Sequence, residues 1–145
     1  MNLAVKMHLI ASWLWRRGPI GRVLGKIVYW LARILTLADI DPRAQIDPTV
    51  VITHGSGVVI GETATVGART RIMPGVVIGA RDWASFKRHA DVGASVDIGT
   101  GAKILGPVTV GDGARIGANA VVLEDVPPGA TAVGVPAKLV FPESE

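Results

Sequence analysis

The chain has 145 residues, enough for one domain with a short appendage, and 49% of them are hydrophobic, with a mean hydropathy of +0.42. It contains no cysteine, which excludes disulfides and a cysteine nucleophile. A net charge of +3 and an aromatic content of 5% argue against nucleic-acid binding, which needs a denser basic face with stacking aromatics.

Residues 1–38 are predicted to be a helical segment. The stretch from Met7 to Trp15 is apolar apart from His8 and Ser12, and apolar residues recur at helical spacing from Ile20 to Leu37. The sequence RRGP separates the two stretches. No apolar run approaches the ~20 residues that span a bilayer. We expect two short helices that pack on the end of the next domain or on a partner subunit. The basic amphipathic pattern also favours a second interpretation, a peripheral contact with an anionic membrane surface.

Residues 39–127 follow a six-residue period, in which an aliphatic residue recurs and a small residue often follows it. A hexad accommodates one short strand and one tight corner, and three hexads make one triangular coil with the aliphatic residues pointing inward. The sequence therefore predicts a mainly β domain, a parallel β-helix. The inward residues are Ile40, Ile46, Ile52, Ile60, Val66, Ile72, Ile78, Val92, Ile98, Ile104, Val110, Ile116 and Val122.

The period is broken at two places. It slips by two residues between Ile52 and Ile60, and a polar, charged loop at residues 80–91 interrupts it outright. Residues 128–145 form a tail rich in Pro and Gly, which we expect to cover the last coil, because an open coil end exposes unpaired backbone groups.

Two histidines lie at these breaks, His54 at the slip and His89 at the end of the loop. An imidazole can take a proton from an alcohol near neutral pH. Asp39 precedes His54 by 15 residues, about one coil, so its carboxylate is a candidate to orient the imidazole. The alternative for each histidine is a surface residue with a local hydrogen bond; the position at a break in a rigid scaffold favours function.

Residues 39–140 closely resemble the serine acetyltransferases, which belong to the hexapeptide-repeat acyltransferases. The resemblance rests on HGSGVVIGET, on the interval from Asp39 to His54, and on the loop that ends in Arg88-His89. It implies a left-handed coil, a hand that the period alone does not fix. It also implies a cytoplasmic enzyme that uses acetyl-CoA and no metal, in homotrimers that pair in some members, with active sites shared between subunits. If the helices bind lipid, the enzyme would lie at the inner membrane surface.

The resemblance assigns roles to individual residues. His54 would be the general base that activates the acceptor hydroxyl for direct attack on the thioester, and Asp39 would support it. The residues expected around the acceptor are Thr53, Glu62, Arg88 and His89. The residues expected around acetyl-CoA are Gly79, Thr100 and Ala118 by resemblance and Lys138 by its charge.

The acceptor stays open between L-serine, or a serine-like alcohol, and a sugar hydroxyl in exopolysaccharide or capsule biosynthesis. Thr53 replaces a family aspartate that binds the amino acid, and Trp83 and Phe86 could stack on a sugar ring. Two other classes share the scaffold. A metal-dependent lyase needs three histidine ligands, whereas only His54 and His89 fall in the coils. A non-catalytic solenoid would release no thiol with any acceptor.

Overall fold

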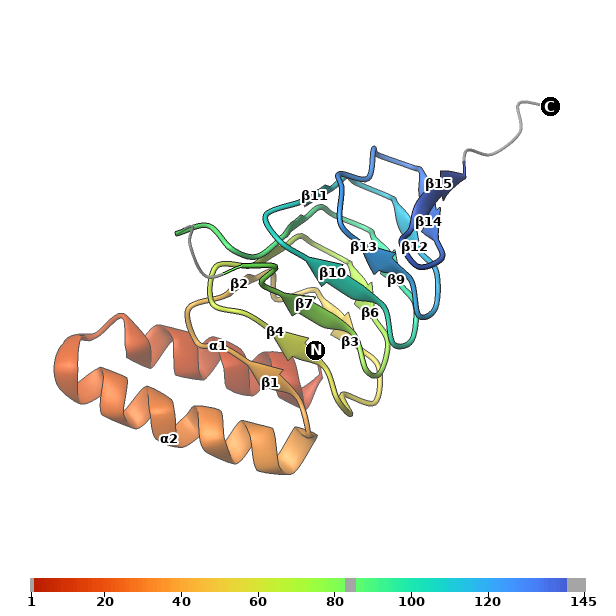
Figure 1. Cartoon of the computed structure of the whole chain (residues 1–145). Helices are drawn as coiled ribbons and strands as arrows, with labels where there is room; N and C mark the ends of the chain where they lie inside the picture. Colours follow the sequence, from red (N-terminus) through yellow and green to blue (C-terminus); the bar gives the residue numbers. More distant parts are fainter. Residues whose placement is uncertain (1, 83–85, 141–145) are drawn as a thin grey trace.

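The computed structural model describes residues 2–82 and 86–140. Its N-terminal part is a hairpin of two helices, α1 (Leu3–Trp15) and α2 (Gly18–Thr36), which lies at one end of a stack of coils (Figure 1). Glycine lets the helices approach closely, since a Cβ on Gly21 would lie 2.3 Å from the carbonyl oxygen of Leu14. Both predicted helices are confirmed. No helix in the described ranges is long and apolar enough to cross a membrane.

The rest of the described chain is a left-handed parallel β-helix, as predicted. Its strands stack into three sheets, in the orders β1-β4-β7-β10-β13, β2-β5-β8-β11 and β3-β6-β9-β12-β14-β15, called here the first, second and third sheets. The strands are β1 (Asp39–Ile40), β2 (Gln45–Ile46), β3 (Val51–Ile52), β4 (Val59–Ile60), β5 (Thr65–Val66), β6 (Arg71–Ile72), β7 (Val77–Gly79), β8 (Asp91–Val92), β9 (Asp97–Ile98), β10 (Lys103–Leu105), β11 (Thr109–Val110), β12 (Arg115–Ile116), β13 (Val121–Val122), β14 (Thr131–Val133) and β15 (Lys138–Val140).

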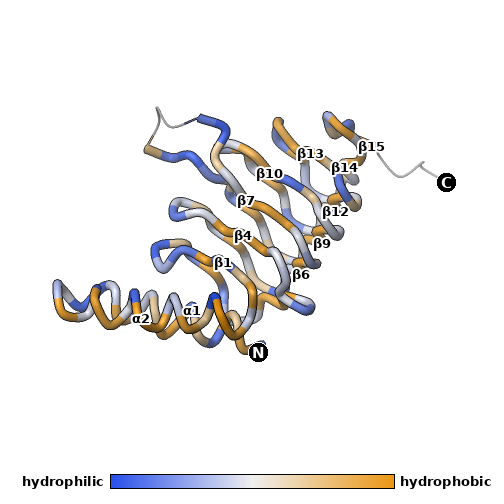
Figure 2. Tube along the Cα trace, turned by 60° about the horizontal axis from the view of Figure 1, so that its bottom comes forward, coloured by the Kyte–Doolittle hydropathy of each residue, from blue (hydrophilic) through white to orange (hydrophobic). Residues whose placement is uncertain are grey.

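The core fills the inside of the coils, and Figure 2 shows hydrophobic residues gathered in the strands and hydrophilic ones at the corners. Every one of the thirteen predicted inward residues is at most 7% exposed. Neighbouring residues point outward, so that Val51 is 46% exposed beside Ile52 at 1%. The core also takes a second residue from each corner, two positions before the aliphatic one, such as Val50 and Val58. This second inward position was not predicted.

Two edges of the prism matter for function. The His54 edge joins the third sheet to the first through the corners at residues 53–58, 73–76, 99–102 and 117–120. The His89 edge joins the first sheet to the second and contains residues 61–64 and the loop between β7 and β8. Backbone hydrogen bonds link successive corners of the His54 edge, for example from Asn119 N–H to Thr100 C=O at 2.8 Å. The corner at residues 53–58 has six residues where the other three have four, and these two extra residues are the slip in the period.

The end of the described chain extends the third sheet. β14 stacks parallel to β12, and β15 turns back to pair antiparallel with β14. The inner residue of β14, Ala132, is 1% exposed, whereas all three residues of β15 are exposed. The tail thus adds a rung to the stack, and β15 forms its outer strand at the end away from the helices (Figure 1).

Candidate active site

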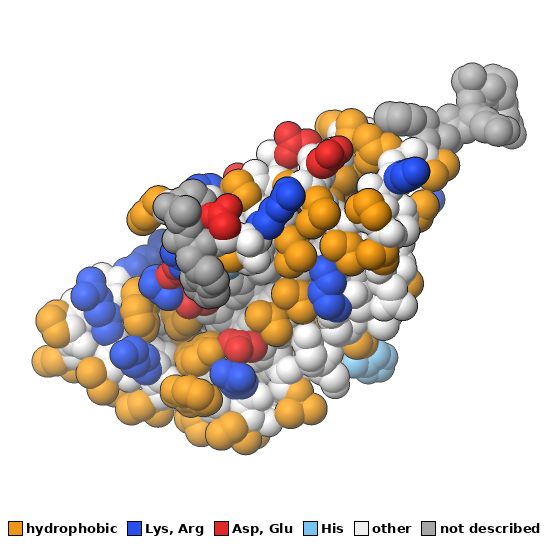
Figure 3. Space-filling view, in the orientation of Figure 1, with side chains coloured by type: hydrophobic (Ala, Val, Ile, Leu, Met, Phe, Trp, Pro, Cys, Tyr) orange, Lys and Arg blue, Asp and Glu red, His pale blue; other side chains and the backbone are white. Residues whose placement is uncertain are grey.

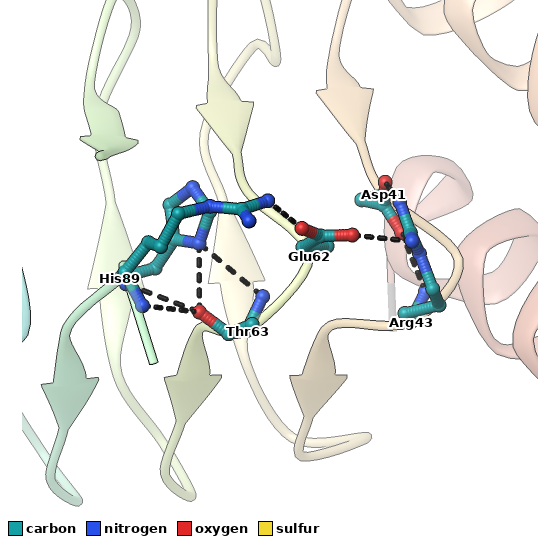
Figure 4. Close-up of polar contacts among 6 residues, drawn as sticks. Asp41, Arg43, Glu62, Thr63 and His89 are labelled. Atoms are coloured by element: carbon teal, nitrogen blue, oxygen red, sulfur yellow. Dashed lines mark hydrogen bonds and ion pairs between the residues drawn. The ribbon is translucent and has the colours of Figure 1, made fainter. Parts of the chain in front are cut away.

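The His89 edge holds a buried imidazole in a fixed orientation (Figure 4). His89 is 6% exposed, and its Nδ1 lies 2.8 Å from Oγ1 of Thr63 and accepts the Thr63 backbone N–H at 3.3 Å. The backbone N–H groups of Arg88 and His89 both donate to the same Oγ1 at 3.1 Å. The hydroxyl of Thr63 therefore fixes the end of the loop. Because Nδ1 of His89 accepts a hydrogen bond from a backbone N–H, the proton of the neutral ring lies on Nε2.

Glycine and charge complete this environment. The imidazole of His89 lies against the backbone of Gly61, where an added Cβ would fall 2.0 Å from Nε2. Burial lowers the pKa of His89, and the positive charges of Arg88 and Lys87 lower it further. The ring is accordingly neutral at pH 7 and presents an Nε2–H donor.

A row of alternating charges leads away from His89 along the same edge. Glu62 forms ion pairs with Arg88 on one side and Arg43 on the other, and Arg43 grips Asp41 with two hydrogen bonds of 2.8 and 2.9 Å (Figure 4). A groove of about 540 Å³ opens here, lined by Glu62, Arg88 and the 94% exposed Phe86, among others. Glu62 thus orients the Arg88 guanidinium beside the groove. Trp83, the other loop aromatic, lies outside the described residues.

His54 is held differently, on an exposed corner. Its backbone is left-handed, with φ of 59°, and a Cβ on the next residue, Gly55, would lie 2.8 Å from the Thr36 carbonyl oxygen. The Gly57 N–H donates to Leu37 C=O at 3.0 Å, so the C-terminal end of α2 supports the corner. The imidazole is exposed and makes no hydrogen bond or ion pair within the described ranges.

Asp39 lies beside this corner, and its carboxylate contacts α2. It accepts a hydrogen bond of 2.5 Å from the Tyr29 hydroxyl and pairs with Arg33 at 3.2 Å. Its partner on the next coil is Val59, because the six-residue corner lengthens this coil to 20 residues. The 15-residue interval thus does not set Asp39 directly against His54, and no hydrogen bond or ion pair joins their side chains in the described chain. A catalytic role for Asp39 stays a prediction.

The residues expected around acetyl-CoA separate into groups. Thr100 and Ala118 are exposed on the His54 edge, on later coils than His54. Beside this edge, a groove of about 390 Å³ runs along the third sheet, and Thr53 is among the residues that line it. Gly79 ends β7, at the start of the loop on the His89 edge, and Lys138 is exposed on β15. Only Thr100 and Ala118 therefore share an edge with His54.

Several participants had not been identified from the sequence. Thr63, Arg43, Tyr29 and Arg33 carry the contacts described above, and none lies at a break in the period. For Thr63 a signal did exist: it precedes His89 by 26 residues, the same interval as between the rung partners Thr65 and Asp91. Among residues 2–82 and 86–140, no group of three or more His, Cys, Asp or Glu side chains is placed to hold a metal ion.

Comparisons with known proteins agree with the fold described above. The family described as bacterial transferase hexapeptide (six repeats) matches residues 89–124. A serine acetyltransferase from Mycobacterium tuberculosis is 50% identical over 137 residues, which cover 94% of this chain and 59% of that protein. One from Synechococcus elongatus is 42% identical over 139 residues, covering 95% and 56%. The chain thus spans less than two thirds of the length of these relatives.

Solved structures give the same result. Soybean serine acetyltransferase complexed with serine matches with a TM-score of 0.91 and 41% identity, covering 95% of this chain and 56% of that one. A serine acetyltransferase in complex with CoA matches with a TM-score of 0.88 and 38% identity, covering 94% and 56%.

Proposed function

Because this chain belongs to the serine acetyltransferase-like family of hexapeptide-repeat proteins, we propose that it transfers the acetyl group of acetyl-CoA to the hydroxyl of L-serine. The observation that carries the proposal is the position of His54. Its imidazole is exposed on a corner braced by α2, on the same edge as Thr100 and Ala118, and the preceding residue, Thr53, lines a groove.

In the proposed reaction, His54 accepts the proton of the acceptor hydroxyl while the oxygen attacks the thioester carbonyl carbon. The C–S bond then breaks, and the departing sulfur of CoA takes the proton from the imidazolium. A serine hydroxyl is almost fully protonated at neutral pH, so a positioned base accelerates the attack by roughly 10²- to 10⁴-fold. The N–H of Asp39 donates to Val58 C=O at 2.8 Å, which fixes the Asp39 backbone beside the corner that carries His54.

We further propose a cyclic homotrimer in which each active site is shared. Within one chain, His54 lies on one edge of the prism, and Arg88 and His89 lie on another. A threefold interface joins two different surfaces of neighbouring copies. It can therefore set the His54 edge of one copy against the His89 edge of the next, with acetyl-CoA between them. Arg88 then binds the carboxylate of serine, and His89 donates from Nε2.

L-serine is preferred to a sugar hydroxyl as the acceptor for two reasons. Relatives at 42–50% identity are serine acetyltransferases, and one of the matching structures holds serine. The Arg88 guanidinium beside the groove, oriented by Glu62, provides a charge for a carboxylate that a neutral sugar lacks.

The proposal is tested by incubating the full chain with acetyl-CoA and a panel of acceptors while measuring thiol release. L-serine should exceed glucose and N-acetylglucosamine by at least about tenfold in kcat/KM, the effect of one charge-assisted contact. A sugar that outperforms serine would overturn the acceptor but keep the chemistry. Thiol release no greater than that measured without any acceptor, for every acceptor in the panel, would overturn acetyl transfer itself.

A further inference from the structure

The outer face of α2 is apolar and uncovered in this chain. Side chains between Ile20 and Leu35 recur on the face turned away from α1, while Gly21 and Gly25 face α1 and are buried. Figure 3 shows hydrophobic side chains along the outer margin of the hairpin, with Lys and Arg groups among them. The large apolar side chains of α2 that are more than half exposed are Ile20, Val23, Ile27, Trp30, Ile34 and Leu35, at 52–78%.

The charges of this segment have one sign. Residues 1–38 contain six Lys and Arg residues and no Asp or Glu. Arg22, Lys26 and Arg33 follow one another at helical spacing along one border of the apolar face, and Arg16 and Arg17 lie where α1 meets α2. The first acidic residue, Asp39, is already bound by Tyr29 and Arg33. An apolar strip on helices that carry only cations fits a surface that is apolar inside and anionic outside.

Two tryptophans of the hairpin, one on each helix, lie beside arginines. The Arg17 guanidinium lies 3.9 Å from the ring centre of Trp13, and the Arg33 guanidinium lies 5.3 Å from that of Trp30. Both tryptophans are more than half exposed. An amphipathic aromatic ring beside a cation suits the boundary between lipid headgroups and acyl chains, where tryptophan is enriched.

A second copy of the chain is a poorer occupant of this face. If two copies paired through α2, they would bring two rows of cations together, and residues 1–38 supply no acid to compensate. An anionic lipid surface supplies the opposite charge along the whole row, worth about 1 kcal/mol for each Lys or Arg near the surface. We propose that the outer face of α2, together with Trp13, docks on a membrane surface that contains anionic lipids.

The docked helix lies in the plane of the interface, as a helix with one apolar and one cationic face does. The hairpin is at the end of the stack opposite β15 (Figures 1 and 2), so the coils project away from the docked hairpin. The docking does not depend on acetyl transfer.

Vesicle flotation of the full chain tests the proposal, with vesicles of phosphatidylcholine alone or mixed with phosphatidylglycerol in roughly equal parts. The chain should float with the mixed vesicles, and high salt should weaken its binding. The double variant Ile27→Glu/Ile34→Glu should lose binding at least about tenfold, and Arg22→Gln about fivefold. Val140→Glu places the same charge at a similarly exposed apolar position (51%) far from the hairpin and should bind like the unaltered chain.

Equal binding to both kinds of vesicle, or binding to neither, would overturn the proposal. So would a double variant that still floats. If the chain ignores vesicles while Ile27→Glu/Ile34→Glu halves its assembly size in light scattering, a second copy covers the face instead. Thiol release with L-serine, measured on the same variants, should persist without vesicles, which separates this proposal from that of acetyl transfer.

Discussion

The His89 edge and the His54 edge hold their imidazoles in opposite ways. His89 is 6% exposed, and Thr63 fixes it together with the end of its loop. His54 is exposed on a corner whose backbone is braced by α2, and its ring makes no hydrogen bond in the described chain. On the His89 edge the imidazole thus has its partners within the chain, whereas the His54 edge presents an exposed imidazole on a braced backbone. This is the arrangement expected if a neighbouring copy completes the site.

The largest effect is expected from removing the imidazole of the His54 edge. His54→Ala should lower kcat by roughly 10²- to 10⁴-fold, because general base catalysis is lost. The thermal unfolding temperature should change little, since the side chain is exposed and unpartnered in the described chain. Steady-state thiol release and circular dichroism provide the two measurements. Unchanged turnover would remove His54 from the chemistry.

On the His89 edge, the critical group is the hydroxyl of Thr63. Thr63→Ala leaves the N–H groups of Arg88 and His89 without their acceptor, at a cost of about 1–3 kcal/mol, and should raise KM for serine by roughly 5- to 100-fold. KM for acetyl-CoA should move far less. Thr63→Ser keeps the oxygen and should behave much like the unaltered chain. An equal loss in both variants would show that the methyl group, not the hydroxyl, matters.

The smallest expected effect is on the pH dependence of stability that His89 causes. The lowered pKa of His89 means that the unfolded chain takes up this proton first as pH falls below 6.5, so the free energy of unfolding should decrease in that range. His89→Gln should flatten this dependence. His8, whose pKa burial lowers to about 4, acts in the same direction in both proteins and cancels from the comparison. Urea unfolding at pH 7 and pH 5 measures the difference. If the free energy of unfolding falls by the same amount in both proteins between pH 7 and pH 5, His89 is not buried as a neutral ring.

Much of the fold was readable from the sequence, because each hexad places one aliphatic residue inward whatever its neighbours are. The slip before Ile60 and the loop before Val92 were also visible as breaks in that period. The partners within the site were harder to predict. Contacts such as Thr63 with His89 cross from one coil to the next, and their interval depends on how many residues a corner or loop inserts.

The environment of Asp39 shows the same limit. Its interval to His54 suggested direct contact, but the two extra residues of the corner shift the register, so that Asp39 pairs with Val59. Its actual partners, Tyr29 and Arg33, come from α2. The direction of α2 relative to the first coil is set by tertiary packing, and the six-residue period does not predict it.

The most direct test of the shared site is complementation between two inactive variants. His54→Ala and His89→Ala each damage a different edge, so a mixed trimer contains some interfaces in which both edges are intact. Equal amounts, unfolded together and refolded, should recover roughly one quarter of the unaltered activity, the fraction expected for random threefold assembly. The separately refolded variants should stay far below that level. If the mixture is no more active than its components, the two edges do not form one site, and the account is contradicted.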